Sequence, residues 1–380
     1  MAFTLTRIER AIQDTIEDTD EYILNMGPQH PSTHGVLRLV LRCDGEIVKE
    51  IIPYFGYLHR CYSKSVEDLN YTQGVPYSDR WDYLASIANN HVASMAIEKL
   101  TGIEVPRRAE YIRVLVHEIQ RVASHLFWFG TMINDIGGYT PFMWAVRHRE
   151  LMVDIFEELS GARLTYHYIR PGGVMKDVTP RAMKLIEQLI REFPQQWRYY
   201  DDLIFGNEIM LIRMDNVGSI DAEKAINYGL SGPMLRAAGV KWDLRKNQPY
   251  SIYPELDFEM ITREKGDCLA RWQVRLDEIK QSMRMVAQTF MGLPAGPFMA
   301  KVPRNIKPAK GETYTAVEAP RGELGMYIYS DGTNKPWRMH CRSSCMINLC
   351  VLNEMSRGMA IADLIAILGS VDIVLGETDR

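Results

Sequence analysis

Three cysteines and one histidine fall within twelve residues near the C-terminus, in the stretch MHCRSSCMINLC (339–350). Thiolates and imidazoles hold structural zinc and iron–sulfur clusters, so Cys341, Cys345, Cys350 and His340 are the right chemical types for a metal site. Free cysteine is also among the most buried residue types in folded proteins. If the segment turns helical, Cys345 lies on an apolar face. We therefore expect these cysteines to be small buried side chains rather than metal ligands.

A second candidate is the loop GPQHPSTHG (27–35), in which His30 and His34 lie four residues apart between prolines and glycines. Histidine can donate or accept a proton near neutral pH, and a rigid loop would hold it in a fixed place. The alternative is a turn whose histidines only bond to backbone groups. The motif alone leaves both interpretations open.

The stretch PYSDRWDYLAS (76–86) gathers Asp79, Arg80, Asp82 and Tyr83 at the start of an expected helix. Acidic residues are common in a first helical turn because they interact favourably with the helix dipole. Tyr83 falls between two apolar positions and could belong to the core. By itself, this stretch is a weak indication of function.

The stretch VHEIQRVASH (116–125) resembles a zinc-protease motif but lacks the second histidine, because Arg121 stands four residues after His117. Glu118, Arg121 and His125 share one stripe of a helix, and a buried ion pair or hydrogen-bonded network is expected there. The sequence contains no G-x-G-x-x-G, Walker A or G-x-S-x-G motif, so we expect no nucleotide site and no serine-hydrolase site on this chain.

The elements that must position these residues are mainly helical. A hairpin is predicted over 36–52, with its turn at Asp44–Gly45. Apolar residues then recur every three or four positions over long stretches, which is typical of helices packed at shallow angles. These stretches are 84–96, 112–129 and 269–290, the last with Asp267 as N-cap.

After residue 291 the sequence becomes rich in turn residues, with MYIYS as a short strand, and a final helix is expected over 344–368. The predicted fold class is α+β, mainly α. Three segments are proposed, which are packed tightly and could form one domain. They are an N-terminal extension with the hairpin (1–75), a central helical bundle (76–291) and a β-containing segment with the C-terminal helix (292–380).

Composition excludes several classes. The 380 residues are 46% hydrophobic and 24% charged, as in ordinary globular cores, and the net charge of -4 offers no basic field for nucleic acid. The longest apolar run is broken by Asp363 and Asp372, so no transmembrane helix is expected. The N-terminus lacks the apolar region of a secretory signal, and six unevenly spaced cysteines indicate reduced thiols on the cytoplasmic side. The 21 methionines fit either a large core or burial against partner subunits.

Eight segments, in order, resemble the signature segments of one family: the quinone-site subunit of respiratory complex I, its D subunit. They are GPQHPSTHGVLRL, GYLHR, PYSDRWDY, RVASHLFWFG, TPFMWAVRHRE, YIRPGGV, GLSGPMLRAAGVKWDLRK and APRGELGMYIYSDG. The resemblance runs from about residue 22 to Arg380. The family descends from the large subunit of [NiFe] hydrogenases, which implies a long-helix bundle flanked by β elements.

That kinship allows a residue-level comparison. Hydrogenase large subunits bind nickel and iron through two C-x-x-C pairs, whose positions correspond here to Asp82 and Ala85 and to Val374 and Glu377. All four thiolates are missing, and alanine and valine carry no donor. The chain is therefore expected to bind no metal, and hydrogenase activity is excluded.

In place of the metal, the resemblance implies a quinone site. It implies that His34 and Tyr83 flank the quinone headgroup as hydrogen-bond donors and proton sources, and that Asp135 holds the loop histidine charged and oriented. Electrons would come from the terminal [4Fe–4S] cluster of a neighbouring subunit, near which the family places Arg80. Flavin and the site for NADH would lie on other chains.

The implied function is that of a subunit of a proton-translocating NADH:quinone oxidoreductase, active only within the multisubunit complex. Expected partners are the iron–sulfur subunit, a neighbour of the C type, the membrane-arm subunit at the quinone channel, and membrane quinone. The expected place is the peripheral arm, on the cytoplasmic side of the cell membrane. Alternatives are a relative fed by ferredoxin or a deazaflavin, and a hydrogenase-fold scaffold without chemistry.

Two departures from the family pattern bear on mechanism. Cys61 and Ser63 stand where the family usually has a glycine and a glutamate, which would alter a charge route locally. Thr165 replaces a histidine near the terminal cluster, although His167 follows two residues on. Loss of a titrating group there should lower the cluster's potential, which favours menaquinone over ubiquinone as the acceptor.

Overall fold

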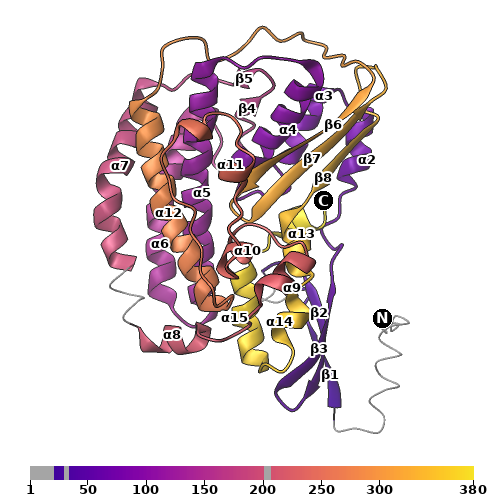
Figure 1. Cartoon of the computed structure of the whole chain (residues 1–380), viewed down its shortest axis with the longest axis vertical. Coiled ribbons are helices and arrows are strands. Elements are labelled where there is room, and N and C mark those ends of the chain that lie inside the picture. The colour runs from indigo at the N-terminus through magenta and orange to yellow at the C-terminus, as the bar shows by residue number, and fades with distance from the viewer. Residues whose placement is uncertain (1–20, 30–33, 201–206) are drawn as a thin grey trace.

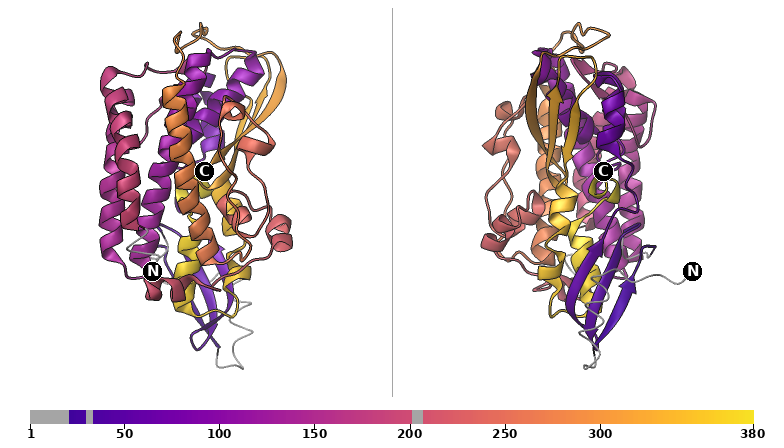
Figure 2. Two further views of the ribbon diagram at one scale, coloured as in Figure 1. Left: turned by 60° about the vertical axis from the view of Figure 1, so that its left-hand side comes forward. Right: turned by 90° about the vertical axis from the view of Figure 1, so that its right-hand side faces the viewer.

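The structure is a computed structural model that describes residues 21–29, 34–200 and 207–380. Upright helices form one side of the molecule, and two three-stranded sheets lie on the other, near opposite ends (Figures 1 and 2). The long helices are α4 (Ser86–Thr101), α5 (Arg107–Asp135), α6 (Tyr139–Ser160), α7 (Pro180–Tyr200) and α12 (Cys268–Met291). The predicted mainly helical α+β class is confirmed.

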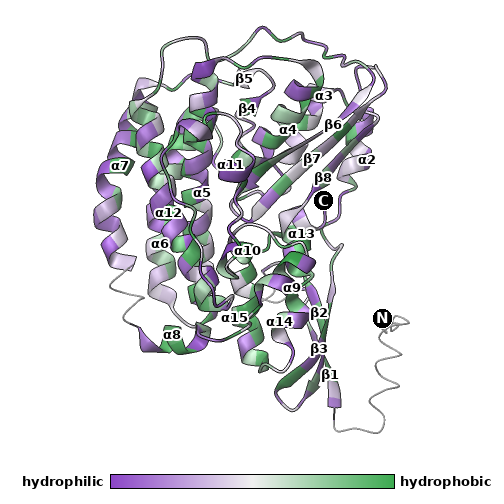
Figure 3. Ribbon diagram, viewed as in Figure 1, coloured by the Kyte–Doolittle hydropathy of each residue, from purple (hydrophilic) through white to green (hydrophobic). Residues whose placement is uncertain are grey.

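Helix α5 is the centre of the bundle and packs against α4, α6, α12 and α15 (Ile361–Val371). From residue 112 to 133 almost every side chain of α5 is buried, polar ones included. The predicted apolar stripe is therefore only part of a helix that is enclosed on all sides. Hydrophilic and hydrophobic residues alternate around the long helices, whereas α15 is largely hydrophobic (Figure 3).

The predicted hairpin is present as β2 (Arg38–Asp44) and β3 (Ile47–Tyr54). The structure adds a third antiparallel strand that the sequence pattern does not predict, β1 (Glu21–Met26), which pairs with β2. Strand β2 buries Leu39 and Leu41 against the bundle core. This strand follows His34, which lies at one end of α5 beside Asp135.

The second sheet is larger than the single strand expected from MYIYS. It consists of β6 (Gly311–Ala319), β7 (Gly322–Ser330) and β8 (Arg338–Arg342), all antiparallel. Strands β6 and β7 pack on α4. The turn that joins them contains only Pro320 and Arg321, and the Arg321 side chain is buried. A further pair of two-residue strands is β4 (Ile169–Arg170) with β5 (Gly173–Val174).

The single helix expected over 344–368 is wrong. This part of the chain forms α13 (Ser344–Leu349), α14 (Leu352–Ser356) and α15, and a last short helix, α16 (Leu375–Thr378), follows. The break before α15 has a physical cause. Gly358 donates a backbone hydrogen bond to Val48 at 2.7 Å, and Val48 donates one to Met359 at 2.9 Å, so this segment extends the pairing of β3.

The remaining elements are short. Before α4 lie α2 (Tyr62–Ser65), a 3-10 turn (Val66–Asp68) and α3 (Tyr71–Ser78). Between α7 and α12 lie α8 (Glu208–Met214), α9 (Ala222–Asn227), α10 (Pro233–Ala237), α11 (Leu244–Asn247) and a second 3-10 turn (Tyr253–Glu255). Buried hydrophobic residues from all three proposed segments mix in the main core, and the segment boundaries stay a prediction. None of the described helices is both long and apolar enough to cross a membrane.

Candidate functional site

A cavity of about 410 Å³ opens at the C-terminal end of α5, and three of the predicted site residues line it: His34, Tyr83 and Asp135. They come from the N-terminal loop, the segment before α4 and the last residue of α5. Phe127 and Trp128 contribute apolar surface to the wall. His30 lies outside the described residues.

His34 and Asp135 form a close pair, with 2.9 Å between Nε2 and Oδ2, and only 16% and 13% of their side chains are exposed. Asp135 ends α5, where the negative end of the helix dipole disfavours a carboxylate. The pair is an ion pair when the imidazole is protonated, and it then offsets that cost. His34 adopts a φ of 52°, a left-handed conformation that non-glycine residues seldom take.

Tyr83 lies in the irregular segment between α3 and α4, where it is half-buried and lines the cavity. Burial raises the pKa of its phenol, and the charge of Asp82 adds to the effect. The hydroxyl therefore keeps its proton at neutral pH. It can donate a hydrogen bond into the cavity.

The four positions that correspond to hydrogenase cysteines come from two segments that meet in space, because Gly376 lies directly against the backbone oxygens of Arg80 and Trp81. Asp82 pairs with Arg321 at 2.5 Å. Glu377 accepts hydrogen bonds from the hydroxyls of Ser343 and Ser344, each at 3.0 Å. Ala85 and Val374 are buried and apolar. Among the described residues, no group of three or more histidine, cysteine or acidic side chains could hold a metal ion.

Arg321 and Asp372 also line the cavity, and the sequence alone does not single them out as site residues. Arg321 reaches from the tip of the β6–β7 hairpin and bonds to Asp82 and, at 2.9 Å, to Asp372. Burial raises the pKa of Asp82 to about 6 and also raises that of Asp372, although Arg321 opposes both effects. In the sequence, Asp372 is visible only as a charge that interrupts an apolar run.

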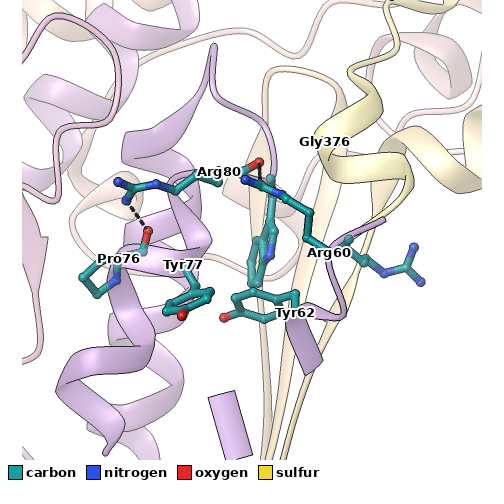
Figure 4. Close-up of a pocket in the computed structure, with 8 residues that line it drawn as sticks. Arg60, Tyr62, Pro76, Tyr77, Arg80 and Gly376 are labelled. Atoms are coloured by element: carbon teal, nitrogen blue, oxygen red, sulfur yellow. Dashed lines mark hydrogen bonds between the residues drawn. The ribbon is translucent and has the colours of Figure 1, made fainter. Parts of the chain in front are cut away.

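Arg80 does not line this cavity but a second one, of about 310 Å³ (Figure 4). Its guanidinium donates to the carbonyl of Pro76 at 2.7 Å, and Arg60 donates to the carbonyl of Arg80 at 3.0 Å. The rings of Tyr62 and Tyr77 form part of the wall. The structure therefore separates Arg80 from the other predicted site residues.

The cysteine-rich segment is partly core. Cys341 and Cys345 are buried, as expected, but Cys350 is exposed, so that expectation is wrong. Cys350 is the C-cap of α13 and lies on its solvent side. The Cys345 thiol lies 3.4 Å from a Glu377 carboxylate oxygen and accepts a bond from the Val374 amide. The segment is therefore distant in sequence from Val374 and Glu377, the second of the compared pairs, but adjacent to it in space.

The two departures from the family pattern have distinct surroundings. Cys61 is exposed and takes a φ of 53°, the left-handed conformation in which glycine is unstrained. Ser63 lies 3.4 Å from a ring nitrogen of His340. Burial lowers the pKa of His167 to about 4, and its backbone amide donates to the buried carboxylate of Asp79 at 3.3 Å.

Comparison with known proteins identifies the family. The family model described as "Respiratory-chain NADH dehydrogenase, 49 Kd subunit" matches residues 135–380. The D subunit of NADH-quinone oxidoreductase from Geobacillus thermodenitrificans is 51% identical over 362 residues, which cover 95% of this chain and 99% of the relative. The corresponding protein of Dehalococcoides mccartyi is 48% identical over 363 residues, with the same coverage of both chains. The chain therefore belongs to the family of complex I D subunits, the 49 kDa subunits of respiratory NADH dehydrogenase, which work within a multisubunit NADH-quinone oxidoreductase.

Proposed function

We propose that the cavity at the end of α5 binds the headgroup of a membrane quinone and that the quinone is reduced there. The observation that carries the proposal is the meeting of His34, Asp135 and Tyr83 on one cavity with apolar walls. An aromatic wall suits a planar ring, and two polar donors suit its two carbonyl groups. A hydrogenase-fold scaffold without chemistry would have no use for this set.

The residues divide the proton chemistry between them. Reduction of a quinone to a quinol consumes two electrons and two protons, and we assign Tyr83 and His34 as the sources of the protons because both line the cavity. When His34 gives up its proton, the ion pair with Asp135 is lost and a carboxylate remains without its counter-charge. This charge imbalance is the local event that would couple quinone reduction to proton movement elsewhere in the complex.

Electrons reach the cavity from the terminal iron–sulfur cluster of a neighbouring subunit, in this proposal. Arg80 and Arg60 line a separate pocket with aromatic walls, which suits the approach of an anionic centre on another chain. A neighbour of the C type and the membrane-arm subunit at the quinone channel are the further proposed partners. The chain would sit in the peripheral arm, on the cytoplasmic side of the membrane.

We favour menaquinone as the acceptor. Thr165 cannot titrate, and the low pKa of nearby His167 leaves it uncharged at neutral pH, so neither supplies a positive charge that would raise the cluster's potential. A redox titration should give a low, weakly pH-dependent midpoint potential for the terminal cluster. A high and strongly pH-dependent potential would contradict the menaquinone assignment.

The quinone site is tested by changing its donors in the assembled complex. Tyr83→Phe removes one hydroxyl and His34→Ala removes the imidazole, and each should lower quinone reduction by about 100-fold, as general acids contribute. Tyr139→Phe is the matched control, because that tyrosine is mostly exposed. If both site variants assemble and reduce quinone at the parental rate, the site assignment is wrong. A flavin-containing NADH module in the purified complex would in turn separate NADH from ferredoxin or a deazaflavin as the donor.

A further inference from the structure

Asp372 is a buried acid on the cavity wall that the proposed proton chemistry leaves unused. It directly follows α15 and is only 5% exposed. Its Oδ1 pairs with Arg321 at 2.9 Å. Its Oδ2 is buried and accepts no hydrogen bond in the described part of the chain. A buried carboxylate oxygen without a hydrogen bond is costly, so its retention beside a cavity calls for an explanation.

The backbone conformation at Asp372 is a second sign that this acid is retained for a reason other than folding. Asp372 has a φ of 61°, in the left-handed region, where glycine is unstrained and aspartate is merely tolerated. Helices commonly end on glycine in this conformation. Here the position carries a side chain, and the residue is part of the cavity wall.

Charged groups from every element around Asp372 act on its proton affinity. Arg321 approaches from the hairpin tip, and the Nε of Arg275 on α12 lies 4.0 Å from Oδ2. His34 lies on the same cavity, and Asp82 shares Arg321 with Asp372. Burial raises the pKa of Asp372, while Arg321, Arg275 and His34 lower it. Burial thus favours the protonated carboxylic acid, and the two guanidiniums favour the ionised carboxylate. The surroundings of Asp372 therefore stabilise both protonation states.

We propose that Asp372 is a proton-exchanging residue of the cavity, which carries a proton on Oδ2 and returns it to His34 after His34 has protonated the substrate. In this step the Oδ2–H bond breaks and an N–H bond forms on the imidazole. The negative charge left on Asp372 is held by Arg321 and Arg275. Asp372 then regains a proton from solvent. The inference rests on the proposed quinone site.

The experiment is redox-induced infrared difference spectroscopy of the assembled complex, which reports the C=O stretch of a carboxylic acid directly. The parental complex should show a carboxylic acid band that changes on reduction and shifts in deuterium oxide. Asp372→Asn should abolish that band, lower kcat about 10-fold or more, and leave KM nearly unchanged. Asp363→Asn is the matched control, because it changes the same residue type at the other end of the same helix.

Each outcome decides for or against the proposal. A band that persists in Asp372→Asn, or a parental kcat in that variant, would overturn it. If Asp372→Asn does not assemble, Asp372→Glu replaces it, which moves the carboxyl group, and a band that keeps its parental frequency then counts against Asp372. The band reports protonation of one acid, whereas the Tyr83 and His34 variants report quinone turnover, so the two proposals can fail separately.

Discussion

Two histidine–carboxylate pairs, each with one member on α5, meet very different surroundings. His34 and Asp135, at the end of α5, are 2.9 Å apart and border a cavity. His125, within α5, lies 3.2 Å from Glu278 of α12, and both side chains are fully enclosed. The chemical groups are alike. What differs is whether a ligand or a proton can reach them.

The enclosed pair belongs to a network of buried charges that runs across the bundle. Arg236 lies 2.7 Å from both Glu278 and Glu318. Burial and the surrounding guanidiniums hold the pKa of His125 at about 4, so the imidazole is neutral at physiological pH. Burial alone would raise the pKa of Glu278, but Arg236, the contact with His125 and Arg245 together outweigh it, lower that pKa and keep the carboxylate ionised. The enclosed pair is thus locked in one protonation state, whereas the cavity pair borders a space that a ligand can enter.

The largest expected effect comes from breaking the enclosed network. Arg236→Met should lower the free energy of unfolding by about 3–5 kcal/mol, because Glu278 and Glu318 would lose their shared counter-charge in a dry interior. Chemical denaturation of the purified chain measures this. Arg163→Met is the control, since that arginine bonds to carboxylates on the surface. If both variants lost the same free energy of unfolding, the enclosed network would be no more important for stability than surface ion pairs.

The next effect is a dependence of stability on pH. In the folded chain the pKa of His125 is about 4, against an ordinary value of about 6.5, so between these values the unfolded chain binds a proton that the folded chain cannot. Stability should therefore be complete above about pH 6.5 and fall as the pH is lowered toward 4, with up to about 3 kcal/mol lost to this residue. His117, whose pKa is about 3, acts in the same direction. In His125→Gln, the free energy of unfolding measured by denaturation should change less with pH across this range. An unchanged pH dependence would show that the fold does not hold His125 in its neutral form.

For the cavity pair we expect the reverse: a substitution should mainly affect activity and hardly affect stability. Asp135→Asn should slow quinone reduction by about 10-fold, equivalent to about 1.4 kcal/mol on the barrier. It should change stability by no more than about 0.5 kcal/mol, because it also removes an unfavourable charge from the end of α5. Glu278→Gln is the matched variant, and it should mainly lower stability. Turnover assays and denaturation of both variants test this division between activity and stability. The division is wrong if Asp135→Asn unfolds the chain.

The sequence reveals the enclosed network more readily than the cavity. Glu118, Arg121 and His125 recur at helical spacing, and the predicted buried network is confirmed: Glu118 lies 3.1 Å from Arg121 and 3.2 Å from Arg245. Local periodicity carries that information. Arg321, by contrast, stands in a two-residue turn, where a charged side chain would ordinarily face solvent.

Contacts between distant segments explain the other errors. The helix expected over 344–368 breaks because Gly358 and Met359 pair with Val48, some 300 residues earlier in the chain. Strand β6 is not predicted from the sequence, although in the fold its Tyr314 covers Gly325 of β7. Neither pairing has a local signal. The residues of the candidate site came from a resemblance, and it was the fold that added Arg321 and Asp372 to the same cavity.

The smallest effect is expected at Cys345, beside the cavity, where the contrast between packing and chemistry is sharpest. Its thiol contacts Glu377 and the Val374 amide, both at 3.4 Å, and a serine hydroxyl can make the same two hydrogen bonds. Cys345→Ser should therefore change the free energy of unfolding by less than about 1 kcal/mol and leave quinone reduction unchanged. Denaturation, turnover and metal analysis of the variant measure this. Stoichiometric zinc or iron that disappears with the thiol would instead make the cysteine-rich segment a metal site, and the cavity would then border two kinds of chemistry.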